Sequence, residues 1–225
     1  FVQLDVLRLA TPASERKVTQ TLAVTHRRCA SVMEELKPLA KLHAPDERQG
    51  FFVVRPADAK DFRPMEAADI YALAEQASLH AGVPAEIRSH FAMAQNLVAY
   101  SWFCYAFNVA AELHAYISVE FALKTRFPAI ANRPFGKLLE NAVNEGLLRR
   151  EGFTYGRNPD RQLYPPELSL PAEITEVRDY VAEIAEAMRT LRNSLAHGAS
   201  TMHMKGGTVL LVCSEVINHP FPQPK

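Results

Sequence analysis

The 225-residue chain carries 25 Lys and Arg against 25 Asp and Glu, and 48% of its residues are hydrophobic. This length allows one substantial core, and this composition excludes a chain dominated by disorder. The balanced charge also excludes a global positive field that would attract nucleic acid, so any RNA binding would depend on local charge.

The three cysteines, Cys29, Cys104 and Cys213, are far apart and lack paired spacing. This pattern favours a reducing cytoplasm over a disulfide framework. His26 and Cys29 could share a helix face, but no second ligand pair follows, so we expect no metal. No glycine-rich phosphate loop or Ser-His-Asp arrangement is present in the sequence, and we expect no cofactor.

The N-terminal part combines helical periodicity with one short strand. Residues 12–44 show loose helical spacing that Pro38 interrupts. Residues 51–54 are apolar and partly β-branched between a glycine and a proline, which predicts a strand. A helix is expected over residues 64–81, because Gly82 and a nearby proline would end it.

The most apolar segment follows, over residues 87–127. Its run from 97 to 111 is rich in aromatic side chains, but a membrane-spanning helix needs about 20 predominantly apolar residues. Asn108 interrupts the run and Glu112 follows it. We therefore predict no membrane span, and instead a buried central helix or a dimer face that Pro128 ends.

A polar stripe marks the second half of that segment. Glu112, Tyr116 and Glu120 follow one another at intervals of four residues, so they share one side of a helix. Polar groups in an otherwise apolar helix need partners, and Arg192 is the candidate. His114 points elsewhere and is interpreted as a core or rim histidine.

The C-terminal half contains two further helices, a long loop and a strand. Helices are expected over residues 134–148 and from about 171 to the glycine at 198, separated by a loop over 152–171 that would be a lid or an insertion. Residues 124–161 contain eight basic and four acidic residues, and this local excess of positive charge indicates either an RNA-binding surface or a solvated loop surface. Residues 208–213 are strongly apolar and predict a strand that pairs with 51–54.

The end of the late helix carries the candidate chemistry. Arg192, Asn193 and His197 lie in its last turns, and Gly198 is a natural C-cap residue. Asn193 and His197 share a face, whereas Arg192 and His197 lie about 140° apart around the axis. Arg192 must therefore reach round the helix or meet a histidine of another chain.

Such a set could support metal-free RNA cleavage. His197 would move the proton of the 2′-hydroxyl or of the leaving group, and Arg192 would hold the scissile phosphate. The same residues also suit a solvated helix end closed by a glycine cap, and the spacing alone leaves both interpretations open.

The Arg-Asn-x-x-x-His-Gly pattern at residues 192–198 resembles the signature of the HEPN superfamily, all-helical domains common in prokaryotic defence and toxin systems. Residues 119–127 are similar to the family's earlier core helix, with an acidic residue followed by a leucine and basic residues. Residues 135–139 together with 146–148 resemble the short helix between them. These stretches occur in the family's order.

This resemblance implies a homodimer that acts as a metal-independent endoribonuclease. Arg192 and His197 match the catalytic pair, Asn193 the polar residue after the arginine, and Glu120 the acidic helper. HEPN toxins silenced by nucleotidylation have a tyrosine two residues after the histidine, and Ala199 stands there in this chain. We do not expect that mode of control.

The expected molecule is thus mainly α, a HEPN-like helical bundle around a long central helix with a small β element. Its expected parts are an N-terminal helical region with a short strand (1–85), the HEPN-like domain (86–200) and a C-terminal strand and tail on the same core (201–225). Its expected partners are RNA, a second copy and an antitoxin or defence protein. The alternatives are a catalytically silent HEPN-like module that binds a protein or a nucleotide, and an unrelated helical regulator.

Overall fold

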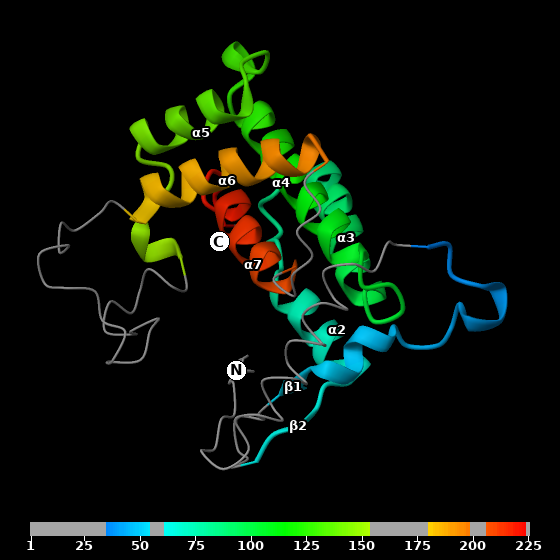
Figure 1. Cartoon of the computed structure of the whole chain (residues 1–225). Helices are drawn as coiled ribbons and strands as arrows, with labels where there is room; N and C mark the ends of the chain where they lie inside the picture. The colour runs from blue at the N-terminus through cyan, green and yellow to red at the C-terminus, as the bar shows by residue number, and fades with distance from the viewer. Residues whose placement is uncertain (1–34, 55–60, 154–179, 199–205, 224–225) are drawn as a thin grey trace, which may run out of the picture.

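The computed structural model describes residues 35–54, 61–153, 180–198 and 206–223. This part of the chain is mainly helical, as expected, and its helices surround one apolar core (Figure 1). It contains six α-helices: α2 (Ala67–Gln76), α3 (Ala85–Tyr100), α4 (Phe107–Arg126), α5 (Phe135–Asn144), α6 (Tyr180–Ala196) and α7 (Gly206–Asn218).

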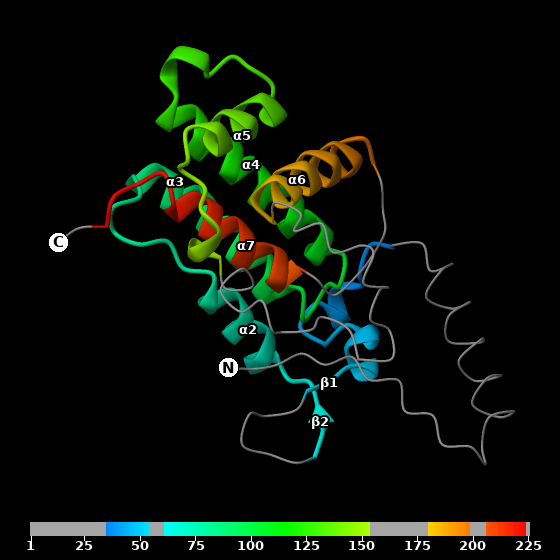
Figure 2. The ribbon, with the colours of Figure 1, turned by 90° about the vertical axis from the view of Figure 1, so that its left-hand side faces the viewer.

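The small β element is a two-stranded antiparallel sheet of β1 (Val53–Val54) and β2 (Arg63–Pro64). It lies beyond α2, away from α5 and α6 (Figures 1 and 2). Val53 pairs with Pro64 and Val54 with Arg63. The predicted pairing of 51–54 with 208–213 is therefore wrong, and the strand itself is shorter than predicted.

Residues 208–213 are helical, which corrects the predicted C-terminal strand. They belong to α7, whose buried residues Leu210, Cys213 and Ile217 recur at spacings of three and four. A short apolar window cannot distinguish a buried helix from a strand, whereas the longer one through 217 shows the helical period. A Cβ at Gly207 would lie 2.9 Å from Leu73 Cβ, so the glycine allows α7 to approach α2 closely.

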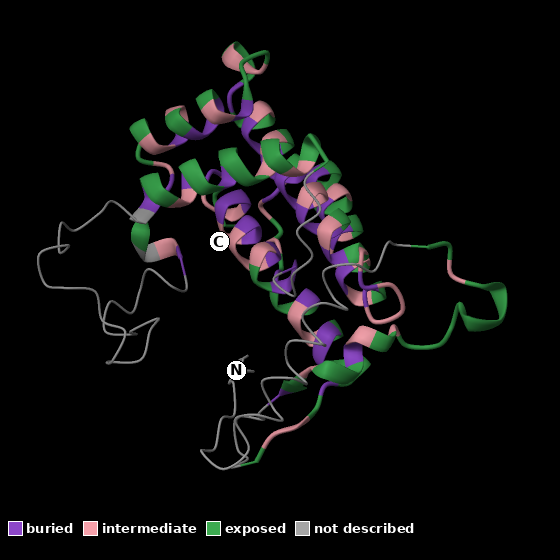
Figure 3. Ribbon diagram, viewed as in Figure 1, coloured by how far each residue is buried: buried purple, intermediate pink, exposed green. Residues whose placement is uncertain are grey.

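Helix α4 is the centre of the bundle and packs against α3, α5, α6 and α7 (Figure 2). Its inward residues are mostly small, including Ala111, Ala115, Val119 and Ala122, and all four are buried. Small side chains let neighbouring helices approach, which allows one helix to contact four others. Figure 3 shows the resulting pattern, with buried residues on the inward faces of the helices.

The apolar segment 87–127 forms two helices rather than one continuous helix, because the chain turns between Tyr100 and Phe107. The segment before β1, residues 35–52, forms hydrogen bonds with this turn, and we call it the clasping segment. Tyr105 donates its backbone N–H to Asp46 at 2.9 Å, and the Gln49 side chain donates to the Ser101 carbonyl at 2.8 Å. These contacts satisfy backbone groups that a continuous helix would have satisfied internally.

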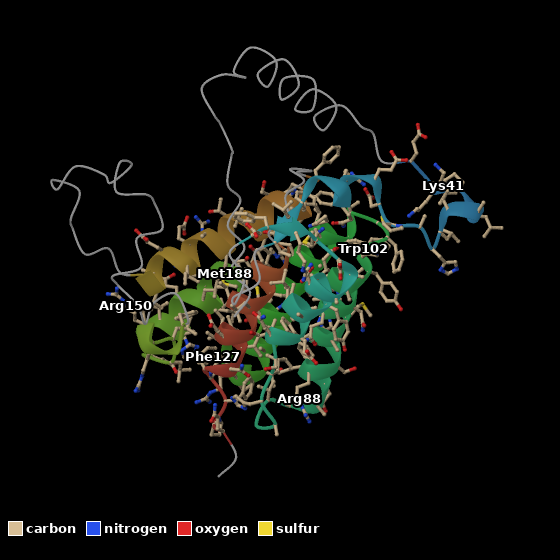
Figure 4. All side chains as sticks on the ribbon, turned by 90° about the horizontal axis from the view of Figure 1, so that it is seen from below. Lys41, Arg88, Trp102, Phe127, Arg150 and Met188 are labelled. Atoms are coloured by element: carbon tan, nitrogen blue, oxygen red, sulfur yellow. The ribbon has the colours of Figure 1, made fainter. Side chains whose placement is uncertain are left out.

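The clasping segment extends outward from the bundle, and Lys41 lies at its outer part (Figure 4). Leu36 and Leu39 are strongly exposed there. Helix α2 begins later than predicted, at Ala67, because β2 occupies residues 63–64 and the Asp69 carboxylate accepts the Glu66 N–H at 2.8 Å. The predicted elements in 12–34, most of the loop 152–171 and the start of the last predicted helix lie outside the described residues.

None of the described helices combines the length and the apolar composition that crossing a membrane requires. The aromatic run 97–111, considered above as a candidate span, is divided between the end of α3, the turn and the start of α4.

Candidate functional site

Helix α6 presents one face to the core and the other to solvent. Val181, Ala185 and Met188 are buried, at spacings of four and three. Asn193 and His197 are exposed. The helical periodicity of the sequence therefore places the candidate polar residues at the surface of the protein.

The C-terminal end of α6 has the predicted glycine cap. His197 donates its backbone N–H to the Asn193 carbonyl at 3.0 Å, and Gly198 donates to the Leu195 carbonyl at 3.0 Å. Gly198 has φ +87°, in the left-handed region that favours glycine. His197 consequently stands in the last turn, with its side chain exposed.

Arg192 is held by an ion pair that links α6 to α4. Its Nη2 donates to Oε2 of Glu120 at 2.8 Å, and Lys124 Nζ lies 2.8 Å from the other carboxylate oxygen. Two cations thus share one carboxylate, which leaves this cluster with a net positive charge. The Glu120 side chain is 14% exposed and that of Arg192 is 30% exposed, so solvent screens the pair only partly.

The remaining contacts of Arg192 orient its guanidinium. Nη1 donates to Oδ1 of Asn193 at 3.3 Å. Nε is buried and has no hydrogen-bond acceptor among the described residues. The guanidinium retains further Nη hydrogens, which could bind an anion. The structure therefore brings together three of the predicted site residues: Arg192, Asn193 and Glu120.

His197 does not join these three residues within the chain. It lies about 7.5 Å further along the helix axis than Arg192 and about 140° around it. It does not line the groove that Arg192 and Asn193 line. Within the described residues, Arg192 and His197 therefore face different surfaces, and a shared site would need a second copy of the chain.

An open groove of about 770 Å³ runs from this cluster between α5 and α6. The two helices lie side by side in Figure 1. Its rims carry two further ion pairs, Lys137 with Glu140 on α5 and Glu186 with Arg189 on α6. Its lining residues are Glu120, Pro134, Phe135, Gly136, Lys137, Leu139, Glu140, Val143, Asn144, Ala182, Ala185, Glu186, Arg189, Arg192 and Asn193.

The other half of the polar stripe on α4 is separate from this site. Glu112 and Tyr116 are buried, and the Tyr116 hydroxyl donates to Glu112 at 3.0 Å. Burial raises the pKa of Tyr116 and of the neighbouring Cys213 thiol, and the Glu112 carboxylate adds to both effects. The Tyr116 hydroxyl and the Cys213 thiol therefore stay protonated inside the bundle. Arg192 pairs with Glu120 rather than with Glu112.

Histidine His114 is half-buried, as predicted for a rim histidine. Its ring stacks on that of His90 with centroids 4.3 Å apart, and its Nε2 lies 3.1 Å from the His90 carbonyl oxygen. Ser118 Oγ donates to the His114 carbonyl, so it accepts a hydrogen bond from His90 Nδ1 at 2.8 Å. This pair lies between α3 and α4.

Lys124, Arg189 and Lys137 are not among the site residues predicted from the sequence. The signal that could have found them is their spacing from a carboxylate three or four residues away on the same helix, which predicts surface ion pairs. Within the described residues, no cluster of three His, Cys, Asp or Glu side chains could hold a metal ion. His26 and Cys29, weighed above as metal ligands, lie outside those residues.

Comparisons with protein-family models, curated proteins and solved structures found no match to this chain. The resemblance to HEPN domains is therefore carried by the chain's own residues alone.

Proposed function

We propose that this protein is a metal-independent endoribonuclease of the HEPN type that acts as a homodimer in a defence or toxin system. The observation that carries the proposal is the cationic cluster at Arg192, which Glu120 orients at one end of an open groove. The exposed His197 lies on the same helix. In the proposed dimer it would approach the equivalent cluster of the second subunit.

In the proposed reaction the 2′-hydroxyl of the RNA attacks the adjacent phosphorus. His197 either accepts the 2′-hydroxyl proton, while water protonates the departing 5′-oxygen, or protonates the 5′-oxygen, while water accepts the 2′-hydroxyl proton. The bond between phosphorus and the 5′-oxygen breaks, leaving a 2′,3′-cyclic phosphate and a 5′-hydroxyl. Arg192 stabilises the negative charge that develops on the phosphate, Asn193 orients the phosphate or the imidazole, and Glu120 positions Arg192.

One observation favours a second candidate function, a catalytically silent HEPN-like module that binds a protein or a nucleotide. The Arg192 guanidinium is already paired with a carboxylate that is 14% exposed, and a phosphate would have to share or displace that partner. Such a module would use the same helices as a dimer scaffold.

The deciding experiment incubates the purified protein with total RNA in the presence of EDTA, and measures its mass in solution by light scattering. The nuclease proposal expects a dimer and cleavage products that end in 2′,3′-cyclic phosphate. A dimer that leaves RNA intact would support the silent module. A monomer without cleavage would contradict both HEPN proposals.

A further inference from the structure

The groove between α5 and α6 differs in charge from the Arg192 cluster at one of its ends. Each rim cation has its own carboxylate, Lys137 with Glu140 at 2.6 Å and Arg189 with Glu186. The body of the groove is therefore neutral, and the positive charge is concentrated at its Arg192 end. A phosphate would be attracted to that end and would gain little from moving further along the groove.

The lining of the groove suits a flat group that is apolar on its faces and polar at its edges. Leu139, Val143 and Ala185 give the groove an apolar floor. Asn144 near one end and Asn193 near the other bring side-chain amides, which can donate to and accept from a nucleobase edge. The volume of about 770 Å³ is within the range of ordinary ligand pockets.

The direction of the groove connects it to the candidate phosphate site. Gly136, near the start of α5, packs beside Arg189, in the second half of α6. The residues of α6 that line the groove run from Ala182, near the start of the helix, to Asn193, near its end. The groove therefore extends from Arg192 toward the N-terminal end of α6, and His197 lies beyond its other end. A strand whose phosphate binds at Arg192 would place a neighbouring nucleotide in the groove.

We infer that the α5–α6 groove binds unstacked bases of a short single-stranded RNA next to the phosphate at Arg192, and that Asn193 and Asn144, at the two ends of the groove, help to select different bases of that strand. The inference rests on the proposed function, because it takes RNA as the ligand. It predicts that cleavage prefers particular bases beside the scissile bond.

The test uses RNA trinucleotides whose 5′ and central nucleotides lack the 2′-hydroxyl, so that they bind without being cleaved. Titration followed by NMR should shift the side-chain amides of Asn144 and Asn193 in the wild type and in His197→Ala. The exposed Ala182→Trp substitution fills the groove and should weaken binding about tenfold or more. Ala187→Trp is the matched control, since Ala187 is exposed on α6 but does not line the groove.

A second variant, Asn144→Ala, keeps the test valid if Ala182→Trp does not fold, and it should change which trinucleotide binds best. Unshifted amides, or equal affinity for the wild type and the groove variants, would overturn the groove proposal. Binding in the groove without any RNA cleavage would overturn only the nuclease. Cleavage whose base preference is unchanged in Ala182→Trp would overturn only the groove proposal.

Discussion

Arg192 on α6 donates to Glu120 on α4 across 72 positions of sequence, at 2.8 Å. This contact fixes where the guanidinium lies relative to the central helix. It also determines what an anion would meet there, because Lys124 shares the same carboxylate and leaves the cluster net positive. A catalytic role and a purely structural role of this pair predict different results when either partner is replaced.

Replacing His197 with Ala tests the general acid or base. We expect the cleavage rate to fall by about 100-fold or more, because proton transfer by a positioned side chain contributes at least that much. Stability should not change, since the side chain is exposed. Single-turnover cleavage of a labelled RNA, together with thermal unfolding, measures both effects.

His43→Ala is the control for this change, because His43 is also exposed but lies on the segment before β1. It should cleave at the wild-type rate. Equal rates for the wild type and His197→Ala would remove His197 from the mechanism.

Replacing Glu120 with Gln tests the partner of Arg192. The free energy of unfolding should fall by about 1 to 2 kcal/mol, because a largely buried guanidinium loses its counter-charge. If Glu120 positions Arg192 for catalysis, kcat should fall while KM changes little, since the loss concerns the transition state. Urea unfolding and steady-state kinetics provide the two measurements.

The exposed Glu75 on α2 offers a matched control, and Glu75→Gln should leave both stability and cleavage unchanged. A Glu120→Gln enzyme with wild-type kcat but reduced stability would assign the pair a structural role only.

The histidine pair between α3 and α4 predicts a pH dependence of stability. Burial lowers the pKa of His90, and the neighbouring His114 lowers it further. The unfolded chain therefore binds a proton on His90 more readily than the folded protein does. The stability present above about pH 6.5 should decline as the pH falls below that value.

Urea unfolding at pH 7.5 and pH 5.5 measures this loss. His90→Gln removes the titrating ring and should reduce the difference between the two pH values, whereas the exposed His43→Gln should preserve it. A wild-type protein that is equally stable at both values would contradict the prediction.

The hydrogen bonds between the clasping segment and the α3–α4 turn predict a second loss of stability, at more acidic pH. Burial opposes ionisation of Asp46, but hydrogen bonds from Arg48 and Tyr105 lower its pKa to about 2. The ordinary value is 3.8, so the stabilising effect of this carboxylate is present above that pH and is lost as the pH falls toward 2. Asp46→Asn should therefore lower the free energy of unfolding at pH 7 by about 1 to 2 kcal/mol.

The difference in the free energy of unfolding between the wild type and Asp46→Asn should be smaller at pH 4 than at pH 7, and smaller again at pH 3. Glu47→Gln is the neighbouring control, because the Glu47 side chain is 94% exposed and its contact with Lys41 is 3.9 Å long. A difference that stays constant between pH 7 and pH 3 would show that the charge of Asp46 is not what stabilises the clasping segment.

The sequence by itself determined the features whose physical cause is local. The spacing of Val181, Ala185 and Met188 makes α6 amphipathic, and Gly198 ends it, because both effects depend on residues within a few turns of one another. The same holds for the polar stripe on α4 and for the mainly helical class. These features could be predicted without knowing what the helices pack against.

The tertiary structure alone decided what depends on contacts between distant segments. Residues 208–213 are helical because α7 buries a longer apolar stripe against α4, although their local composition favours a strand. Arg192 selects Glu120 over Glu112 because the crossing of α6 over α4 places only the former within reach. The α5–α6 groove exists only where the two helices lie side by side, since a groove is formed by packing and has no sequence period of its own.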